Sequence, residues 1–574
     1  MTLVSHLRRQ LRATIEELNL RGMQKASKWA SEQLIGMVET GTDVGASVFW
    51  EGDEEEEEAR GAPPRGLLRG LTNREMDLVM VGQSLIVSGE YQRCWHLLRS
   101  TFMQGDCSQP STSTLGSFLV SYSLYMTGEQ LKGQQCSEQQ GLEEYNTAMA
   151  SAGNCGAQPP TSEGSSATGA NAALNRNKDK DAAMANAIGN PFLRDLYEEL
   201  NPSYAKGQLQ DPYLLYLLGV IERDLNKHGF RTHDGCGNNV PPHGSSSSSS
   251  LSWHILLQSV HINPFNWSCW LEIAAICISD QVSPPSFQAL LSPPSLDSDV
   301  GAAMDLEADH TTPPSSQRLS SYWFMYNHFL IHLYLEQQLG HLALPLINGL
   351  SQVLPNSQCL MNLKALSFYC LREYDSAEQE FETARACDPY CLDHIDTYSN
   401  ILYVKEDKVQ LSHLAHMLTK IGKYRPEVCC VVGNYYSLKG LHERAILYFQ
   451  RALRLNPKFL SAWTLMGHEY VELRNTSSAV YCYRKAVDVS PFDYRAWYGL
   501  GQTYEMLHLY QNAIYYYRKA TSLKPQDARM WCAIASCLLR LGERAKAIAA
   551  YERAVETGDR EGIATELLNE LRNS

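Results

Sequence analysis

A 34-residue period in the second half of the sequence restricts the folds open to this chain more than any other feature. Pro457, Pro491 and Pro525 are spaced by 34 residues, and Pro355 and Pro389 share that spacing. If each proline stands at position 32 of a repeat, seven consecutive repeats without insertion begin at residues 324, 358, 392, 426, 460, 494 and 528. A period of this length indicates stacked repeats, in which each unit buries its apolar face only against its neighbours.

Side chains of one kind return at fixed positions of these repeats. The small residues are Ala365, Gly433, Gly467, Gly501 and Ala535 at position 8, Ala343, Ala377, Ala445, Ala479, Ala513 and Ala547 at position 20, and Ala384, Ala452, Ala486, Ala520 and Ala554 at position 27. The aromatic residues are Trp463, Trp497 and Trp531 at position 4, and Phe381, Phe449, Tyr483, Tyr517 and Tyr551 at position 24. This pattern resembles the tetratricopeptide repeat, a pair of antiparallel helices. We therefore expect an all-α, right-handed superhelical solenoid with a concave groove and long disordered loop insertions.

The rest of the sequence predicts further helices separated by low-complexity segments. Residues 1–129 form a helical, repeat-like region with Gly82 at position 8 of one unit and an acidic loop at 51–58. The other predicted segments are a disordered insertion at 130–190, irregular repeats at 191–280 with a loop at 226–250, a linker rich in Pro and Ser at 281–320, the seven in-frame repeats at 321–561, and a C-terminal helix or tail at 562–574. Residues 130–190 contain few large apolar side chains, so burial cannot offset the entropy of ordering them.

Charge and cysteine content argue against several classes of protein. The net charge is −14, whereas proteins that bind nucleic acids or membrane surfaces usually carry a basic face, so we expect neither partner. No apolar run approaches the roughly 18 residues of a membrane span, and the first ten residues do not begin a signal peptide. The 16 cysteines show no disulfide framework, which predicts reduced thiols in a cytosolic or nuclear protein.

We find no catalytic, cofactor or metal motif in the sequence. The phosphate-binding G-x-x-x-x-G-K-[ST], the nucleophile elbow G-x-S-x-G, the zinc motif H-E-x-x-H and the dinucleotide motif G-x-G-x-x-G are all missing. The pairs Cys387/Cys391 and Cys532/Cys537 have no second pair at a zinc spacing and are better explained as small side chains in helix packing. We therefore expect a binding protein with no enzymatic activity, cofactor or metal.

The first helix of each repeat, helix A, should line the concave groove. Its positions 2, 5, 9 and 12 should face inward, because positions 4, 7, 8 and 11 pack between repeats. The predicted peptide-binding residues are Asp393, Asp396, Asn400, Tyr403, Asn434, Ser437, His468, Tyr498, Gln502 and Glu505. Side-chain amides can bond the backbone of an extended peptide, and carboxylates can pair with an arginine. The alternative is that these residues are only solvated surface.

A different use of the groove is disfavoured. Chaperone-binding repeats hold a peptide C-terminal carboxylate with lysine and arginine side chains of neighbouring A helices. Here the inward residues at position 5 are Asn362, Asp396, Cys430, Thr464 and Tyr498. None is a lysine, and the acid would repel a carboxylate.

Several segments of the sequence resemble one known family. The segments are CCVVGNYYSL at 429–438, YFQRALRLNP at 448–457, AWTLMGHEYVE at 462–472, DYRAWYGLGQTYE at 493–505, DPYCLDHIDTYSNILYV at 388–404 and ERAVETGD at 552–559. They resemble the family of the eighth subunit of the anaphase-promoting complex, or cyclosome, of the Cdc-twenty-three type. The resemblance is specific over about 320–560 and fainter over 1–103 and 190–280.

This resemblance implies a non-catalytic scaffold subunit of a ubiquitin ligase that degrades mitotic regulators, in nucleus and cytoplasm. It also implies three kinds of partner: other cyclosome subunits, a second copy bound through the N-terminal repeats, and coactivators of the Cdc-twenty type. The coactivators would place their arginine-containing C-box in the C-terminal groove, where Asp393 and Asp396 fit such a ligand. We expect Asp396→Lys to weaken that binding without unfolding the solenoid.

Other hypotheses remain open at this point. A general repeat adaptor in another multiprotein machine would share the fold but need not share the segments at 388–404 and 493–505. A repeat-bearing transferase would need a catalytic domain, and the segments outside the repeats have the composition of loops. Ser283, Ser292 and Thr312 precede prolines in the linker and are candidate sites for proline-directed kinases.

Overall fold

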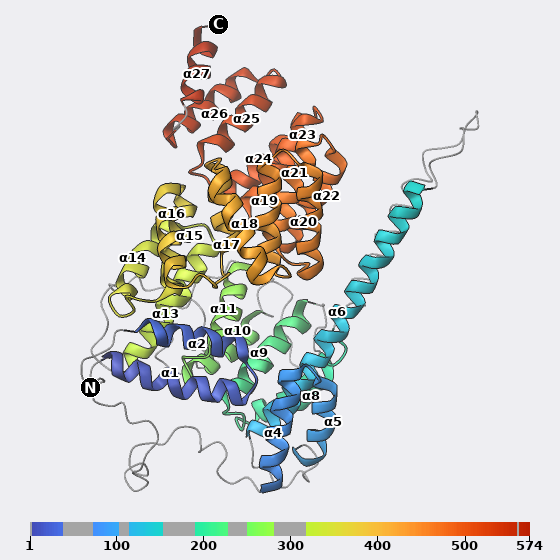
Figure 1. Cartoon of the computed structure of the whole chain (residues 1–574), viewed down its shortest axis with the longest axis vertical. Helices are drawn as coiled ribbons and strands as arrows, with labels where there is room; N and C mark the ends of the chain where they lie inside the picture. Colours follow the sequence, from blue (N-terminus) through green and yellow to red (C-terminus); the bar gives the residue numbers. More distant parts are fainter. Residues whose placement is uncertain are drawn as a thin grey trace, which may run out of the picture. The chain divides into compact units, whose positions relative to one another are not determined.

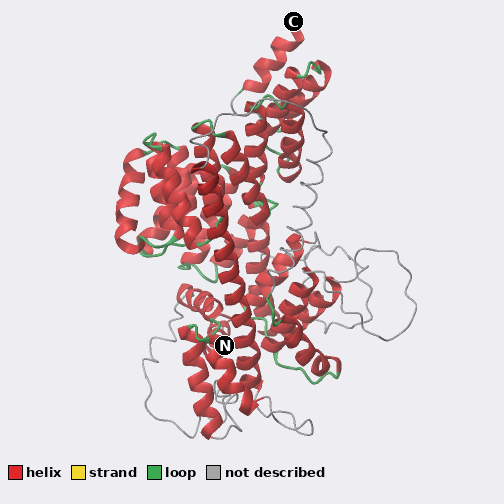
Figure 2. Ribbon diagram, turned by 90° about the vertical axis from the view of Figure 1, so that its right-hand side faces the viewer, coloured by secondary structure: helices red, strands yellow, loops and turns green. Residues whose placement is uncertain are grey.

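The computed structural model describes residues 3–37, 73–102, 114–152, 190–227, 249–279, 317–558 and 562–573. All regular elements in these ranges are α-helices joined by loops, which confirms the predicted all-α class (Figure 2). None of the helices so described has both the length and the apolar content needed to cross a membrane.

The chain forms two compact parts. The N-terminal lobe comprises residues 1–333 and 349–357, and the C-terminal lobe comprises 334–348 and 358–574. The helices up to the boundary are α1 (Leu3–Leu20), α2 (Gln24–Gly36), α4 (Asn73–Ser88), α5 (Tyr91–Phe102), α6 (Thr114–Ala152), α8 (Leu193–Ala205), α9 (Pro212–Lys227), α10 (Ser249–Ile262), α11 (Trp267–Ser279), α13 (Gln317–Glu336) and α14 (Gly340–Ser351) (Figure 1).

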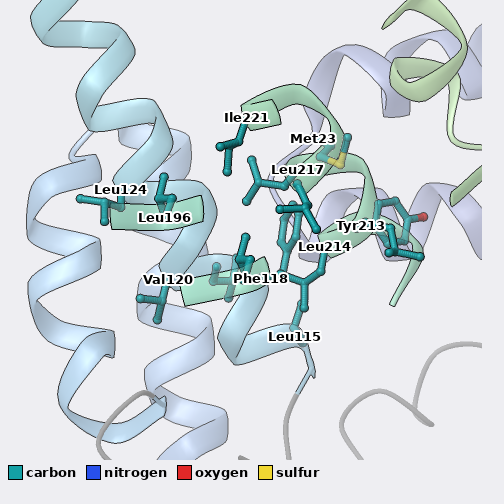
Figure 3. Close-up of a cluster of buried hydrophobic side chains, with 14 of the residues drawn as sticks. Met23, Leu115, Phe118, Val120, Leu124, Leu196, Tyr213, Leu214, Leu217 and Ile221 are labelled. Carbon is teal, nitrogen blue, oxygen red and sulfur yellow. The ribbon is translucent and has the colours of Figure 1, made fainter. Parts of the chain in front are cut away.

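The core of the N-terminal lobe joins helices that lie far apart in the sequence. Figure 3 shows Leu115, Phe118 and Leu124 of α6 in one cluster with Leu196 of α8 and with side chains of α9. These residues are at most 8% exposed, so the cluster excludes water almost completely. Burial of such side chains contributes about 1.5–3 kcal/mol each, so this cluster stabilises the lobe substantially.

A buried ion pair lies beside this core. The Arg21 guanidinium donates to the Asp211 carboxylate at 3.2 Å, and both side chains are 3% exposed. The guanidinium carbon also lies 4.0 Å from the centre of the Tyr213 ring, in cation–π geometry. The pair connects the turn after α1 to the start of α9.

Helix pairs of the N-terminal lobe use the close approach expected of repeats. A Cβ atom on Gly82 would lie 2.8 Å from Leu98 of the partner helix α5, and one on Gly219 of α9 would lie 2.7 Å from Leu256 of α10. Such distances leave no room for a side chain, so the glycines permit the helix packing. Gly82 thus lies at a close helix approach, as its predicted position 8 requires, and Gly219 permits the same approach in a second helix pair.

The predicted insertion at 130–190 is wrong at its start, because α6 continues to Ala152. Residues 131–152 contain several Gln, Glu and Ala residues, which are good helix formers, and this local propensity favours the helix despite the scarcity of large apolar side chains. The remainder of the insertion, the acidic run 51–58 and most of the loop 226–250 and of the linker 281–320 lie outside the described residues. In the linker, helix α13 already begins at Gln317.

The C-terminal lobe contains the predicted helix pairs in frame. After α13 and α14, they are α15 (Gln358–Leu371), α16 (Tyr374–Cys387), α17 (Ile395–Val404), α18 (Lys408–Gly422), α19 (Pro426–Leu438), α20 (His442–Leu455), α21 (Leu460–Glu472), α22 (Thr476–Val489), α23 (Tyr494–Met506), α24 (Tyr510–Leu523), α25 (Ala528–Arg540) and α26 (Arg544–Glu556). From α19 onward each helix packs on the next one along the chain, which is the contact pattern of a solenoid.

Two positions of the repeat fit each other. The aromatic side chain at position 24 points at the small residue at position 8 of its own repeat: a Cβ atom on Gly433, Gly467 or Gly501 would lie 2.4–2.6 Å from a ring atom of Phe449, Tyr483 or Tyr517 respectively. The alanines at position 20 are all 0% exposed. Small residues therefore let the two helices of a repeat approach, and the ring fills the space between them.

The tryptophan at position 4 stabilises the first turn of helix A in the last three repeats. The indole Nε1 of Trp463, Trp497 and Trp531 donates to the backbone oxygen of the proline six residues earlier, at 2.9, 2.8 and 3.1 Å. Trp270 makes the same bond to Pro264 at 2.7 Å in the N-terminal lobe. The Pro-x₅-Trp spacing thus marks the start of a repeat in the N-terminal lobe, outside the seven repeats of the 34-residue frame.

The repeat that starts at 392 keeps the frame with a shorter first helix. Helix α17 begins only at Ile395, after a loop, and Leu411 replaces the usual alanine with full burial. Helix α18 is capped by Asp407, whose carboxylate accepts from the amides of Val409 and Gln410 at 3.0 Å.

At the C-terminal end, α27 (Ile563–Asn573) packs Ala564 and Leu568 into the cluster of α25 and α26. It therefore covers the apolar face of the last repeat.

Candidate peptide-binding site

The predicted groove residues lie on helix α17, or just before it, and on helices α19, α21 and α23. Asp396, Asn434 and Ser437 are buried, and Asp393, Asn400, His468, Tyr498 and Glu505 are half-buried. Tyr403 and Gln502 are exposed. The structure therefore divides the predicted set into buried residues, which connect repeats, and accessible ones, which a ligand could touch directly.

The buried amide of Asn434 connects two neighbouring A helices. Its Nδ2 donates to Asn400 Oδ1 at 2.8 Å and to Ser399 Oγ at 2.9 Å. Ser399 in turn donates to the backbone oxygen of Asp396 at 2.7 Å. Asn434 is 1% exposed, so its role is to hold α17 and α19 in register and to orient the half-buried Asn400.

In the next repeat, the buried carboxylate of Glu469 connects α21 to α19. Ser437 Oγ donates to Glu469 Oε1 at 2.7 Å and lies 3.3 Å from the Tyr403 hydroxyl. The other oxygen of Glu469 is 2.8 Å from His442 Nδ1. Glu469 is 4% exposed and stands at position 10 of its repeat, outside the predicted inward positions. Glu469 is thus a site residue that the sequence pattern missed.

Asp396 is less accessible than the sequence argument assumed. Its Oδ2 accepts a hydrogen bond from Ser461 Oγ at 2.8 Å, across 65 residues, and the side chain is 8% exposed. The expected effect of Asp396→Lys must therefore be corrected, because a lysine would also lose this bond and crowd a buried position. A carboxylate held by one neutral donor still retains acceptor capacity for a guanidinium.

His468 is held against the aromatic ring of its own repeat. Its Nδ1 is 2.8 Å from the Tyr483 hydroxyl, and the two rings meet edge to face with centroids 5.5 Å apart. Burial, together with the nearby positive charge of Arg495, lowers the pKa of His468 to about 4. The imidazole is therefore neutral at physiological pH and can offer a hydrogen bond but not a charge.

Glu505 is the last acid, in chain order, among the predicted groove residues of the A helices. It accepts from the Tyr517 hydroxyl at 2.8 Å and from Ser536 Oγ at 3.2 Å, which links α23 to α24 and α25. Burial, followed by the Glu505 charge, raises the pKa of Tyr517, so this tyrosine stays protonated and donates. Tyr498 packs at 5.3 Å from the same ring, beside Glu505.

The carbonyl end of α15 contacts the starts of two distant repeats. Arg372 forms an ion pair with Asp527, and Lys524 Nζ donates to the backbone oxygen of Cys370 at 3.1 Å. Tyr369 lies beside Arg495, and burial raises the pKa of this tyrosine to about 12. These contacts span 126–155 residues. They limit how far the repeats that carry the predicted groove residues can move apart.

Cysteine and acidic side chains are possible metal ligands in the described part of the chain. Its cysteines are free, and it has no group of three or more His, Cys, Asp or Glu side chains that could hold a metal ion. The candidate phosphorylation sites Ser283, Ser292 and Thr312 lie outside the described residues.

Comparisons with known proteins point to one family. The family model described as Anaphase promoting complex subunit 8 / Cdc23 matches residues 6–229 and 244–291, where the resemblance in the sequence is faint. Tetratricopeptide-repeat models match residues 426–459, 464–528 and 528–557. The repeats and the N-terminal half are therefore identified independently.

Curated relatives match across both halves. Anaphase-promoting complex subunit CDC23 of Saccharomyces cerevisiae is 31% identical over 499 residues, which cover 84% of this chain and 71% of that protein. Anaphase-promoting complex subunit 8 of Arabidopsis thaliana is 32% identical over 486 residues, covering 82% of this chain and 66% of that protein. The subunit 8 of Dictyostelium discoideum is 41% identical over 231 residues, 40% of this chain and 34% of that protein.

Proposed function

The chain belongs to the anaphase-promoting complex subunit 8 / Cdc23 family, and we propose that it is a non-catalytic repeat scaffold of an anaphase-promoting complex. In this proposal the C-terminal repeats bind the arginine-containing C-box of a coactivator. Membership confirms the family predicted from segments such as 388–404 and 493–505. The ligand and the scaffold role are carried over from the family resemblance.

The observation that carries the peptide proposal is the hydrogen-bonded row on α17, α19, α21 and α23. Asp396 and Glu505 supply carboxylates along this row, and each is fixed by a hydrogen bond to another helix of the repeats. The buried Glu469 joins two A helices of the row, α21 and α19. Fixed acceptors lose little entropy when a ligand binds, and carboxylates pair with guanidinium groups better than with other side chains. Asn400 and Gln502 add amides that can bond the backbone of an extended peptide.

Binding of a labelled C-box peptide to the full chain, followed by fluorescence anisotropy, tests this proposal. We expect saturable binding that is lost when the arginine of the peptide is replaced by alanine. A matched peptide with its arginine retained and a different position changed to alanine controls for general loss of contacts. Equal binding of all three peptides would remove the carboxylate row from the mechanism.

We also propose self-association through the N-terminal lobe. Large apolar side chains are exposed on its first helices, including Ile35 at 81%, Met80 at 61% and Val87 at 63%. Met80 and Val87 are seven residues apart and so share one face of α4, and an exposed apolar face of this kind is typical of protein interfaces. We expect Met80→Lys with Val87→Lys to convert a dimer to a monomer in light scattering, whereas Val409→Lys, at a 79% exposed position of the C-terminal lobe, should leave the mass unchanged.

The scaffold role and the location are tested together in cells. We propose that the tagged chain is present in nucleus and cytoplasm and co-purifies with a cullin-like subunit, a RING subunit and other repeat subunits in one particle. Recovery of a different machine would leave the fold and the family in place and overturn the proposed assembly. The purified chain alone should show no ubiquitin transfer.

A further inference from the structure

The outward side of three consecutive B helices carries an unusual set of residues. Positions 22, 25, 26 and 29 of a repeat share one face of helix B, because they are spaced as i, i+3, i+4 and i+7. We call this set in α20, α22 and α24 the outer face: Leu447, Gln450, Arg451, Arg454, Tyr481, Arg484, Lys485, Asp488, Tyr515, Arg518, Lys519 and Ser522. It contains six bases and one acid, a net charge of +5 in a chain of net charge −14.

The positive charge is greatest on α20 and α24, each of which has a net charge of +2 at these four positions. The same four positions are Gln379, Glu382, Thr383 and Ala386 in α16, and Ala549, Glu552, Arg553 and Glu556 in α26. Both of those faces have a net charge of −1, and the face of α18 has a single lysine. The repeat fold therefore does not require bases at these positions.

An apolar row runs beside the bases. Leu447, Tyr481 and Tyr515 stand at position 22 of their repeats, 34 residues apart, and are 63%, 52% and 56% exposed. The Tyr481 ring meets Trp463 edge to face at 6.2 Å, and Tyr515 meets Tyr516 at 5.2 Å. These aromatic contacts hold the rings in place while leaving one side of each accessible.

The bases of α24, and Arg484 of α22, are the exposed charges on which a partner could act. Arg518 and Lys519 are exposed and form no ion pair within the described residues. Arg484 donates to the Tyr504 hydroxyl at 3.0 Å, a neutral partner that positions the guanidinium without neutralising it. Exposed, unneutralised charges attract an oppositely charged partner over about a Debye length, roughly 8–10 Å at physiological salt.

We propose that the outer face of α20, α22 and α24 binds an acidic polypeptide segment of a partner protein, with aromatic or apolar side chains between its carboxylates. The carboxylates would pair with the bases at positions 25 and 26, and the apolar side chains would cover the row at position 22. This surface is distinct from the A-helix row, so the inference does not depend on the proposed coactivator site. Nucleic acid is a poorer match, because the total charge of the chain repels it.

The test uses the full chain and a fluorescently labelled random copolymer of glutamate and tyrosine, with polyglutamate of the same length for comparison. We expect the copolymer to bind more tightly than polyglutamate, with an affinity that falls as salt is raised. Arg518→Glu with Lys519→Glu should weaken binding at least about tenfold. Lys546→Glu with Arg553→Glu on α26, matched in charge change, should leave it within about twofold, and circular dichroism should show equal helix content for both variants.

A second variant tests the contribution of the apolar row at position 22. Tyr481→Ser with Tyr515→Ser should weaken binding of the copolymer and leave binding of polyglutamate unchanged. Equal losses for the α24 and α26 charge variants, or tighter binding of oligothymidylate than of the copolymer, would overturn the proposal. So would copolymer binding that appears only after residues 51–58 are deleted, since the acidic run of the chain itself would then be the occupant.

Discussion

The side-chain amide of Asn434 donates to the side-chain oxygen of Asn400, 34 residues earlier, at 2.8 Å. The two residues occupy position 9 of neighbouring repeats. The hydrogen bond therefore joins equivalent positions of two stacked repeats. It shows that the polar residues on the A helices have two roles, because they connect repeats as well as facing a possible ligand. The predictions below separate these roles.

Asn434→Ala should destabilise the C-terminal lobe. The substitution removes two hydrogen bonds and leaves the buried Ser399 Oγ without its donor, for an expected loss of about 1–3 kcal/mol. The shift of the urea unfolding midpoint, followed by circular dichroism, measures this loss. Gln502→Ala, at the exposed position 9 of a later repeat, is the control and should change stability by no more than about 0.5 kcal/mol. Equal effects would show that the inter-repeat bond contributes nothing.

Gly467→Ala should also be destabilising, although alanine is the better helix former. The added Cβ would lie 2.6 Å from the Tyr483 ring, which is 0% exposed and cannot move without disturbing its neighbours. We expect a loss of about 1–3 kcal/mol from overpacking. The matched control is Gly133→Ala in α6, where a Cβ meets nothing within 4 Å and where thermal stability should rise slightly or stay the same. A Gly467→Ala protein as stable as wild type would refute the fit between positions 8 and 24.

The Gly467–Tyr483 relationship was predictable from the sequence because both positions belong to one repeat. They are 16 residues apart, and the 34-residue frame returns the same pair in several repeats. The frame also correctly predicted the helix pairs, since one helix hairpin is a local structure. The same reasoning places Gly82 at the small-residue position of a unit in the irregular half.

Contacts between distant repeats were not predictable in this way. Asp396 bonds Ser461 across 65 residues, and Arg372 pairs with Asp527 across 155, distances set by the twist from one repeat to the next. The inward direction of Glu469 depends on the same twist. The position of Asp396 in its repeat predicts an accessible acid, whereas the structure buries it beside Ser461, which lies two repeats further along the chain.

Lowering the pH from 7 to 5 should destabilise the wild-type chain partly through His468. The pKa of this residue falls from 6.5 in the unfolded chain to about 4 in the folded one. The unfolded chain therefore binds the proton first, and the stabilisation present above pH 6.5 is lost as the pH falls toward 4. At pH 5 the loss is at most about 2 kcal/mol, since one pKa unit corresponds to about 1.36 kcal/mol.

The variant His468→Gln isolates this contribution. Glutamine retains a hydrogen-bonding group for the Tyr483 hydroxyl but does not titrate in this range. We expect its melting temperature to fall less than that of wild type between pH 7 and pH 5. His341→Gln is a control at a histidine on the outside of α14, and it should follow the wild-type pH dependence. Parallel pH profiles for His468→Gln and wild type would contradict the lowered pKa.

Asp396→Asn is a sharper test of the peptide site than a charge reversal. Asparagine keeps an oxygen that can accept from Ser461, so stability should change by less than about 1 kcal/mol, while the charge that would pair with an arginine is removed. We expect binding of the C-box peptide to weaken about tenfold in fluorescence anisotropy. Ser461→Ala is the reciprocal control, because it removes the hydrogen bond and keeps the charge. If both variants bind the peptide as wild type does, Asp396 is a structural residue only.

The ion pair between Arg372 and Asp527 should couple repeats that are far apart in the sequence. Asp527 is 3% exposed, so its charge is poorly solvated and depends on its partners, and Arg529 lies at a longer 3.6 Å. A double-mutant cycle with Arg372→Ala and Asp527→Ala should give a coupling energy of about 1–2 kcal/mol from urea unfolding. The exposed pair Lys546–Glu543 is the control and should give less than about 0.5 kcal/mol.

Because the contact between Arg372 and Asp527 spans the repeats that carry the predicted groove residues, Arg372→Ala should also speed hydrogen exchange in α17, α19 and α21 and leave exchange in α26 unchanged. Unchanged exchange throughout would mean that the row holds its shape without this contact.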